Sequence, residues 1–408
     1  MTGSRFNAAD FQAPADVLNR WRTLALGVGG IFTIIWAIGT FFNVEQGLRS
    51  WLLGFIFWGG IGIGSLGVLL LQYLTGGAWG VVIRRFVEAG SRTIFPLLFI
   101  LFLPVLIGVS SLYEWTHLND AVSQWRQPFL NVPWWIFRAL LYLSLFSLIA
   151  FFLNKWSAQQ DQTNNYEDSA KFLEIATKVS GPGLVFFIII VSFAAIDWVM
   201  TLDPHFFSTI WGLLFVAGWA LSCFCFMVAV MAALSDKPPL NRVLGKRHFH
   251  DIGKLMLALV MVWAYFNFSQ YLIIWSGNIP EETKWYLARS EGTWGVIGVI
   301  LIILHFAFPF LVLLSRDLKR NAKWLMRTAM FILVFRLVDM YYLIGPSPRI
   351  GTHGQEVPFF LSFSWMDIVA PIAVGGIWLW WFFGELMKRP LVPVNDPFLE
   401  NAIEHGKH

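Results

Sequence analysis

Charged residues are scarce in this chain of 408 residues. Asp, Glu, Lys and Arg make up 13% of it, about half the share that is usual in soluble proteins. Hydrophobic residues make up 57%, with 39 Phe and 22 Trp. A water-soluble fold cannot cover that much apolar surface, so the composition excludes an ordinary cytosolic enzyme. The net charge of +4 does not indicate nucleic-acid binding, because basic residues of membrane proteins gather in cytoplasmic loops.

Cysteine and metal-binding motifs are also nearly absent. Cys223 and Cys225 are the only cysteines, and we expect both to be packing residues. No C-x-x-C or C-x-x-C-H motif appears, and no phosphate-binding G-x-x-x-x-G-K-[ST] loop, which excludes c-type haem attachment and an ATP-driven pump. Of the eight His, only His305 is deep in an apolar segment, whereas a membrane b-type haem needs facing pairs. The sequence therefore predicts no metal site and no redox cofactor bound by this chain alone.

Long apolar runs take the place of those motifs. A membrane-spanning helix needs about 20 mostly apolar residues, and irregular backbone cannot face lipid. Ten segments qualify, so we expect an all-α integral membrane domain over residues 22–387, between polar tails at 1–21 and 388–408. The expected spans are residues 22–43, 51–74, 93–112, 134–154, 182–202, 209–234, 252–276, 291–315, 323–344 and 365–387.

The distribution of basic residues predicts the orientation. An even number of spans places both termini on one side of the membrane. The tails and the loops on that side, including 75–92 and 155–181, hold 21 Lys and Arg, against five on the opposite side and three within spans. By the positive-inside rule both termini are cytoplasmic, and we expect a multi-pass protein of a bacterial inner membrane without a signal peptide.

Ionisable residues inside the spans are the main functional signal, because they are costly there and usually face the interior or a cavity. Asp197 lies in the outer third of span 182–202, with Asp203 and His205 at the outer mouth. No basic residue lies one turn from Asp197 along its helix, so this carboxyl is a candidate for carrying a proton in an apolar pocket.

A second group lies on span 323–344. Arg336 and Asp339 are three residues apart and share a helix face, so they can pair. Such a pair either belongs to a proton relay or is a closed ion pair that fixes packing, and the sequence favours neither. Four further ionisable residues are expected near the outer surface: Glu114, His117, Arg138 and Asp367.

His305 is expected in the cytoplasmic half of span 291–315. Pro309 follows it by four residues and has no N–H, so the carbonyl of His305 loses its helical donor and the helix becomes irregular. Water can reach such a polar point within the membrane. A packing role for His305 stays open beside a role in proton transfer.

Several motifs in order along the chain resemble a known family. The chain is similar to the ActF-type membrane subunits of alternative complex III, which are related to the NrfD/PsrC family. The similarity covers nearly the whole chain, although no single motif is diagnostic. The motifs that carry it are Leu74 to Gly80, Arg84-Arg85, Glu88-Ala89, Pro104, Leu112 to Trp115, Asp197-Trp198, Asp203 to His205, His305 to Pro309, Arg316, Asp339 and Pro346.

The resemblance implies an architecture and partners. It implies two four-helix bundles, helices 2–5 and 6–9, with helices 1 and 10 peripheral. The complex would oxidise menaquinol or ubiquinol and pass electrons through iron–sulfur clusters and c-type haems in other subunits. The implied partners are the sister subunit ActC, the iron–sulfur subunit ActB and multihaem cytochrome c subunits.

Three hypotheses follow. In the first, the chain is a subunit of a quinol-oxidising complex and conducts protons, with Asp197, Asp203, His205, Arg336 and Asp339 in the outer part of the path and His305 in the inner part. In the second, it is a structural scaffold, or binds quinone itself. In the third, it is an independent secondary transporter with a substrate site near the midplane. Genes for multihaem and iron–sulfur proteins next to this one would favour the complex.

Overall fold

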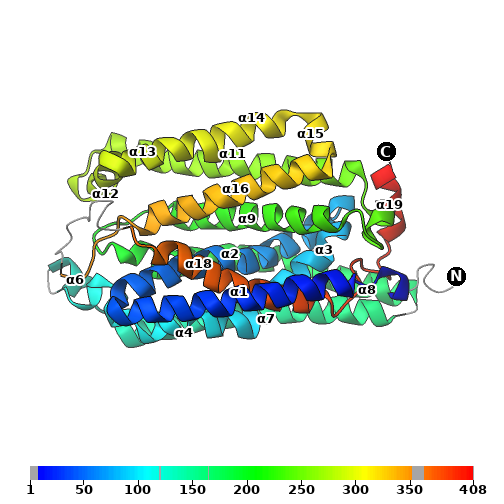
Figure 1. Cartoon of the computed structure of the whole chain (residues 1–408), viewed down its shortest axis with the longest axis horizontal. Helices are drawn as coiled ribbons and strands as arrows, with labels where there is room; N and C mark the ends of the chain where they lie inside the picture. Colours follow the sequence, from blue (N-terminus) through cyan, green and yellow to red (C-terminus); the bar gives the residue numbers. More distant parts are fainter. Residues whose placement is uncertain (1–7, 119–120, 164, 352–362, 408) are drawn as a thin grey trace.

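The computed structural model describes residues 8–118, 121–163, 165–351 and 363–407, and these residues form helices and connecting loops without a strand. Long helices lie side by side along one axis of the molecule (Figure 1). Within the described ranges, nine of them are long and apolar enough to cross a membrane. An all-helical, multi-pass membrane protein, as the sequence predicts, is therefore the fold.

The nine helices coincide with nine of the expected spans. Three are composite: α3 leads into α4 through η2, which contains a kink because the backbone of Phe95 is not helical. α8 continues into η4 (Met200–Leu202), and α13 continues through the π-helical segment η5 into α14. Their bounds are α1 (Ala15–Phe42), α2 (Val44–Thr75), α3 (Ala78–Ser91) with η2 (Ile94–Leu98) and α4 (Phe99–Ile107), α7 (Val132–Gln162), α8 (Tyr166–Trp198), α9 (Trp211–Leu234), α11 (Lys246–Gly277), α13 (Gly292–Ile300) with η5 (Leu301–Ala307) and α14 (Phe308–Leu314), and α18 (Met366–Leu386).

One further long helix, α16 (Ala322–Ile344), coincides with expected span 323–344. It is not among the nine because four charged residues are spread along its 23 residues. Shorter elements connect the long ones or cover their ends. They are η1 (Ala8–Phe11), α5 (Val109–Leu112), η3 (Glu114–Thr116), α6 (Ala121–Arg126), η4 (Met200–Leu202), α10 (Leu240–Val243), α12 (Pro280–Ser290), α15 (Arg316–Arg320) and α19 (Leu399–Lys407).

The segment 75–92 differs from its expected form as a cytoplasmic loop. Residues 78–91 form α3, and Arg84, Arg85 and Glu88 on it are buried. Hydropathy assigns such a segment to a loop because it counts each charge as solvent-exposed. Here the charges are instead paired with residues of other segments, namely Asp161, Arg389 and Asp396. The helical segment that was expected over 93–112 therefore begins at Ala78, with a kink at Phe95.

Helices α2 and α9 form the centre of the molecule and pack against each other. In the most apolar 18-residue stretch of each helix, 94% of the residues of α2 and 83% of those of α9 are buried, compared with 17% for α1. The contact is close because Gly60 and Gly64 on α2 face Trp219 on α9, and a β-carbon at either glycine would overlap it. Small residues that let backbones approach are what helix packing in lipid requires.

Helices α1 and α18 pack against each other and cover α2 from one side. Both ends of the chain lie at the same end of the molecule (Figure 1). At this end, α19 packs against α3 and α11, and Nε2 of His248 lies 2.8 Å from the carbonyl oxygen of Ala402. The C-terminal segment is thereby joined to the helical core.

Candidate functional site

A buried ion pair joins α7 and α8. Arg138 donates from Nε and Nη2 to the two carboxylate oxygens of Asp197, at 2.7 and 2.9 Å. The hydroxyl of Tyr142 donates to Oδ2 of Asp197 at 2.8 Å. Asp197 is fully buried, and Arg138 is nearly so. Asp197 therefore has a basic partner, but from the neighbouring helix, and a two-point arginine–carboxylate contact of this kind is strong and orients both groups.

A second buried ion pair lies on α16. Arg336 and Asp339, one turn apart, are in direct contact, as their spacing allows. Oδ2 of Asp339 also accepts a hydrogen bond from Nε1 of Trp263 on α11, at 3.2 Å. Nε of Arg336 donates to the hydroxyl of Ser222 on α9, at 3.4 Å. This pair therefore connects three helices.

His305 lies next to this second pair. Its ring packs edge-on against Trp263, with 4.3 Å between ring centroids. His305 is fully buried, and neither ring nitrogen has a hydrogen-bond partner among the described residues. We call His305, Trp263, Arg336 and Asp339 the His305 cluster. A buried imidazole without a partner is costly, which sets this cluster apart from the Arg138–Asp197 pair.

The helix that carries His305 is irregular at this point. Residues Leu301–Ala307 are π-helical, directly before Pro309. Because proline has no N–H, the usual α-helical bond to the carbonyl of His305 is missing. The sequence predicts an irregular helix here, and the structure confirms it as a π-helical segment. Such segments occur frequently at functional sites.

Gly218 on α9 makes room for Arg336. A β-carbon at Gly218 would overlap the guanidinium group of Arg336. Arg336 is only 1% exposed, so it has little space into which it can shift. A residue without a side chain, Gly218, therefore lies where the buried guanidinium group of Arg336 contacts α9.

Asp367 fixes the start of α18 to α2. Its carboxylate accepts hydrogen bonds from Nε2 of Gln46 at 2.8 Å and from the hydroxyl of Ser50 at 2.6 Å, both on α2. It also accepts from the backbone N–H of Ser364 at 2.8 Å. Oε1 of Gln46 in turn accepts from Arg349 at 2.5 Å. These contacts attach two chain segments to the end of α2.

The other expected site residues lie in loops or short elements. Oδ1 of Asp203 accepts hydrogen bonds from the backbone N–H groups of His205 and Phe206, at 3.1 and 3.3 Å. Nε2 of His117 lies 2.7 Å from the carbonyl oxygen of Ser110, and Glu114 is buried in η3. The contacts of Asp203 and His117 stabilise their own turns. Of the ten expected residues, Arg138 pairs with Asp197, and Arg336 pairs with Asp339.

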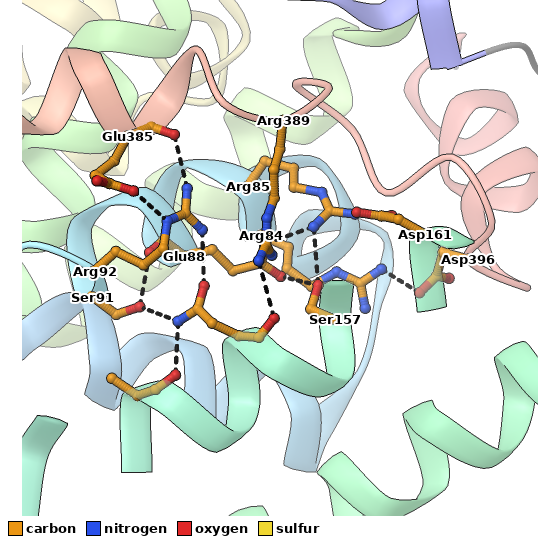
Figure 2. A network of polar contacts seen from close by, with 12 residues as sticks. Arg84, Arg85, Glu88, Ser91, Arg92, Ser157, Asp161, Glu385, Arg389 and Asp396 are labelled. Atoms are coloured by element: carbon orange, nitrogen blue, oxygen red, sulfur yellow. Dashed lines mark hydrogen bonds and ion pairs between the residues drawn. The ribbon is translucent and has the colours of Figure 1, made fainter. Parts of the chain in front are cut away.

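A third group of buried charges lies near the end of the molecule that holds both termini. Figure 2 shows it as a group of polar contacts around α3. Glu88 is fully buried and contacts Arg85 at 2.7 Å and Arg389 at 3.5 Å. The hydroxyl of Ser157 on α7 donates to Glu88 at 2.6 Å, and Asp161 on α7 pairs with Arg85.

The network continues on both sides of Glu88. Arg84 pairs with Asp396 in the C-terminal segment. Arg92 donates from Nε to Oε2 of Glu385 on α18 at 2.9 Å, and from Nη1 to Oδ1 of Asn154 on α7 at 2.8 Å. We call this set the terminal-end network (Figure 2). It joins α3, α7, α18 and the C-terminal segment at one end of the molecule.

From the sequence, these arginines are expected to be cytoplasmic charges, and Arg84-Arg85 is also one of the motifs of the family resemblance. One signal for a buried helix was present, because Arg84, Glu88 and Arg92 recur every fourth residue and so lie on one helix face. Their partners lie far along the chain, at positions such as 385 and 396, and no local pattern identifies them.

Among the described residues, no three His, Cys, Asp or Glu side chains are grouped so that they could hold a metal ion. A scan against protein-family models finds no match, and a search of curated proteins finds no relative.

Proposed function

We propose that this chain is an integral membrane subunit of a quinol-oxidising respiratory electron-transfer complex, of the alternative complex III type. Its role there is to contribute a transmembrane proton pathway and to hold the membrane sector together. The ordered sequence motifs support the assignment to the complex. The observation that carries the proton pathway is His305, a fully buried imidazole without a hydrogen-bond partner among the described residues, on a π-helical segment beside an ion pair.

The proposal includes ten spans, with α16 as the ninth in order. What supports this is that α16 is 23 residues long and packs against the apolar helix α9. It also includes two four-helix bundles, α2 to α8 and α9 to α16, with α1 and α18 peripheral. Support comes from the packing of α8 against α2 and α7, and of α11 and α16 against α9.

The proposed orientation puts both termini in the cytoplasm of a bacterium, with the protein in its inner membrane. Both termini lie at one end of the molecule (Figure 1), and most of the basic residues belong to the tails and loops of this side. The terminal-end network then lies at the cytoplasmic surface. The loops that hold Asp203 and His117 lie at the outer surface.

The chemistry of the proposed pathway follows from the His305 cluster. A proton on His305 places a second positive charge in the buried space that already holds Arg336. The carboxylate of Asp339 compensates one of these charges, and Trp263 contacts both Asp339 and His305. Protonation of His305 is therefore coupled to the Arg336–Asp339 contact, and coupling of this kind is what a gated proton path needs.

A scaffold function is the second candidate, and the Arg138–Asp197 pair favours it for the α7–α8 half. Both carboxylate oxygens of Asp197 are occupied by Arg138 and Tyr142. A carboxylate held by two such partners is fixed in orientation and joins the two helices tightly. The two candidates are compatible, because they concern different halves of the molecule.

The proposal places the redox chemistry in other subunits. Quinol oxidation, iron–sulfur clusters and c-type haems would belong to partners that resemble ActC, ActB and multihaem cytochromes c. This chain would supply helices, a proton path and contact surfaces in the bilayer.

Purification of the native protein in mild detergent tests the assignment. We expect multihaem cytochrome c and iron–sulfur subunits to co-purify, identified by mass spectrometry and by a c-type haem absorption spectrum. A colourless protein that purifies alone would contradict the complex and would favour an independent transporter.

A further inference from the structure

A groove runs along the outside of the helices beside the terminal-end network. Its volume is about 850 Å³, within the range of ligand sites in proteins. It is bounded by the region where α3 leads into α4, by α7 and by the end of α18. We propose that this groove binds one anionic phospholipid of the membrane leaflet at this end, with the phosphate at the charged end and an acyl chain along the apolar walls.

The apolar part of the groove follows the helix axes. Its wall on α7 consists of residues three or four apart, Ser144, Ser147, Leu148 and Phe151, which lie on one helix face. Phe95 and Phe99 form the facing wall. From Ser144 to Lys155 the α7 wall covers roughly 16 Å of helix axis. Phe95, Leu148 and Phe151 are each more than half exposed, so in a bilayer they contact lipid chains.

Positive charge gathers at one end of the groove only. Arg92, Lys155, Lys388 and Arg389 line this end, and Glu385 is the one carboxylate among the lining residues. Arg92 and Lys388 share Glu385, at 2.9 and 2.5 Å. Two cations on one carboxylate leave an excess of positive charge, to which Lys155 adds. Basic pockets between membrane helices at the cytoplasmic side attract anionic headgroups in this way.

Trp381 offers a further polar contact at the same place. It lines the groove, and its buried indole N–H has no hydrogen-bond partner among the described residues. An indole at the membrane interface commonly donates to headgroup oxygens. Four cations and an unpaired donor suit a phosphodiester better than a neutral quinone head. The apolar wall suits a lipid better than free phosphate.

Binding of defined lipids to the delipidated, full-length protein tests this assignment. We would titrate phosphatidylglycerol and phosphatidylcholine with identical acyl chains and measure affinity by native mass spectrometry. The double variant Lys155→Gln with Lys388→Gln removes two of the four cations. We expect wild type to prefer phosphatidylglycerol, and the double variant to bind it about tenfold or more weakly, since it lacks two of the four cations that attract the headgroup.

The matched control is the double variant Lys171→Gln with Lys178→Gln. These lysines lie on α8, are exposed and do not line the groove, so the control should bind phosphatidylglycerol as wild type does. A second variant, Ser147→Phe, fills the groove without changing charge and should also abolish selective binding. Equal affinity of wild type for both lipids, or equal loss in the control, would overturn the proposal. So would displacement of the bound lipid by millimolar inorganic phosphate or by a quinone at equal concentration.

Discussion

The two buried ion pairs, Arg138–Asp197 and Arg336–Asp339, differ in whether the polar groups around them all have hydrogen-bond partners. Arg138 and Asp197 meet at two points, and Tyr142 donates to the same carboxylate. Arg336 and Asp339 also meet, but beside them His305 has no hydrogen-bond partner among the described residues. A fully satisfied buried pair is difficult to rearrange, whereas a buried polar group without a partner can still take up a hydrogen-bond partner such as water. The comparison assigns packing to the first pair and proton transfer to the second.

Removal of Asp197 should have the largest effect on stability. Asp197→Leu leaves Arg138 buried and without its counter-charge, which costs about 3–5 kcal/mol. We expect loss of folded protein or a strongly lowered melting temperature in detergent. The double variant Asp197→Leu with Arg138→Met removes both charges and should recover most of the loss. No recovery in the double variant would mean that the pair has a role beyond packing.

Trp263→Phe tests the connection within the His305 cluster. The substitution removes the N–H that donates to Asp339 and reduces the ring that packs on His305. Loss of a hydrogen bond to a charged group costs about 1.5–3 kcal/mol, to be measured by thermal unfolding. Trp134→Phe is the control, because Trp134 lies at the start of α7 and is half exposed. Equal destabilisation by the two variants would contradict a special role of Trp263.

Gly218→Ala tests the space around Arg336. The added β-carbon overlaps the buried guanidinium group, and overpacking of this kind costs about 1–3 kcal/mol. Gly30→Ala on α1 is the matched control, since nothing lies within 4 Å of its β-carbon position and alanine suits a helix better than glycine. We expect the control to melt at or slightly above the wild-type temperature. A wild-type melting temperature for Gly218→Ala would mean that Arg336 adjusts freely.

The sequence predicts the helical framework well because hydropathy reports which segments can face lipid. Nine of the expected spans coincide with apolar helices of the structure. The contact between Arg336 and Asp339 follows from their spacing of three residues along one helix. The partner of Asp197 could not be predicted, because Arg138 is 59 positions away on another helix. For the same reason α3 was assigned to a loop: its arginines pair with Asp161 and Asp396, which only the folded chain brings near.

His305→Phe should have the smallest effect on stability. It replaces a buried ring that has no hydrogen-bond partner among the described residues with an apolar ring of similar shape. Such a change is nearly neutral or stabilising, so we expect a melting temperature at or above that of wild type. A strong loss of stability would show that His305 is a packing residue whose nitrogens matter to the fold.

The same variant tests the central claim most directly. We would reconstitute the purified complex into proteoliposomes and measure the protons translocated per electron during quinol oxidation, for wild type and for His305→Phe. The account predicts that electron transfer continues while the proton-to-electron ratio falls clearly below the wild-type value. An unchanged ratio at unchanged turnover would contradict a proton pathway through His305 and would leave the scaffold function as the better account.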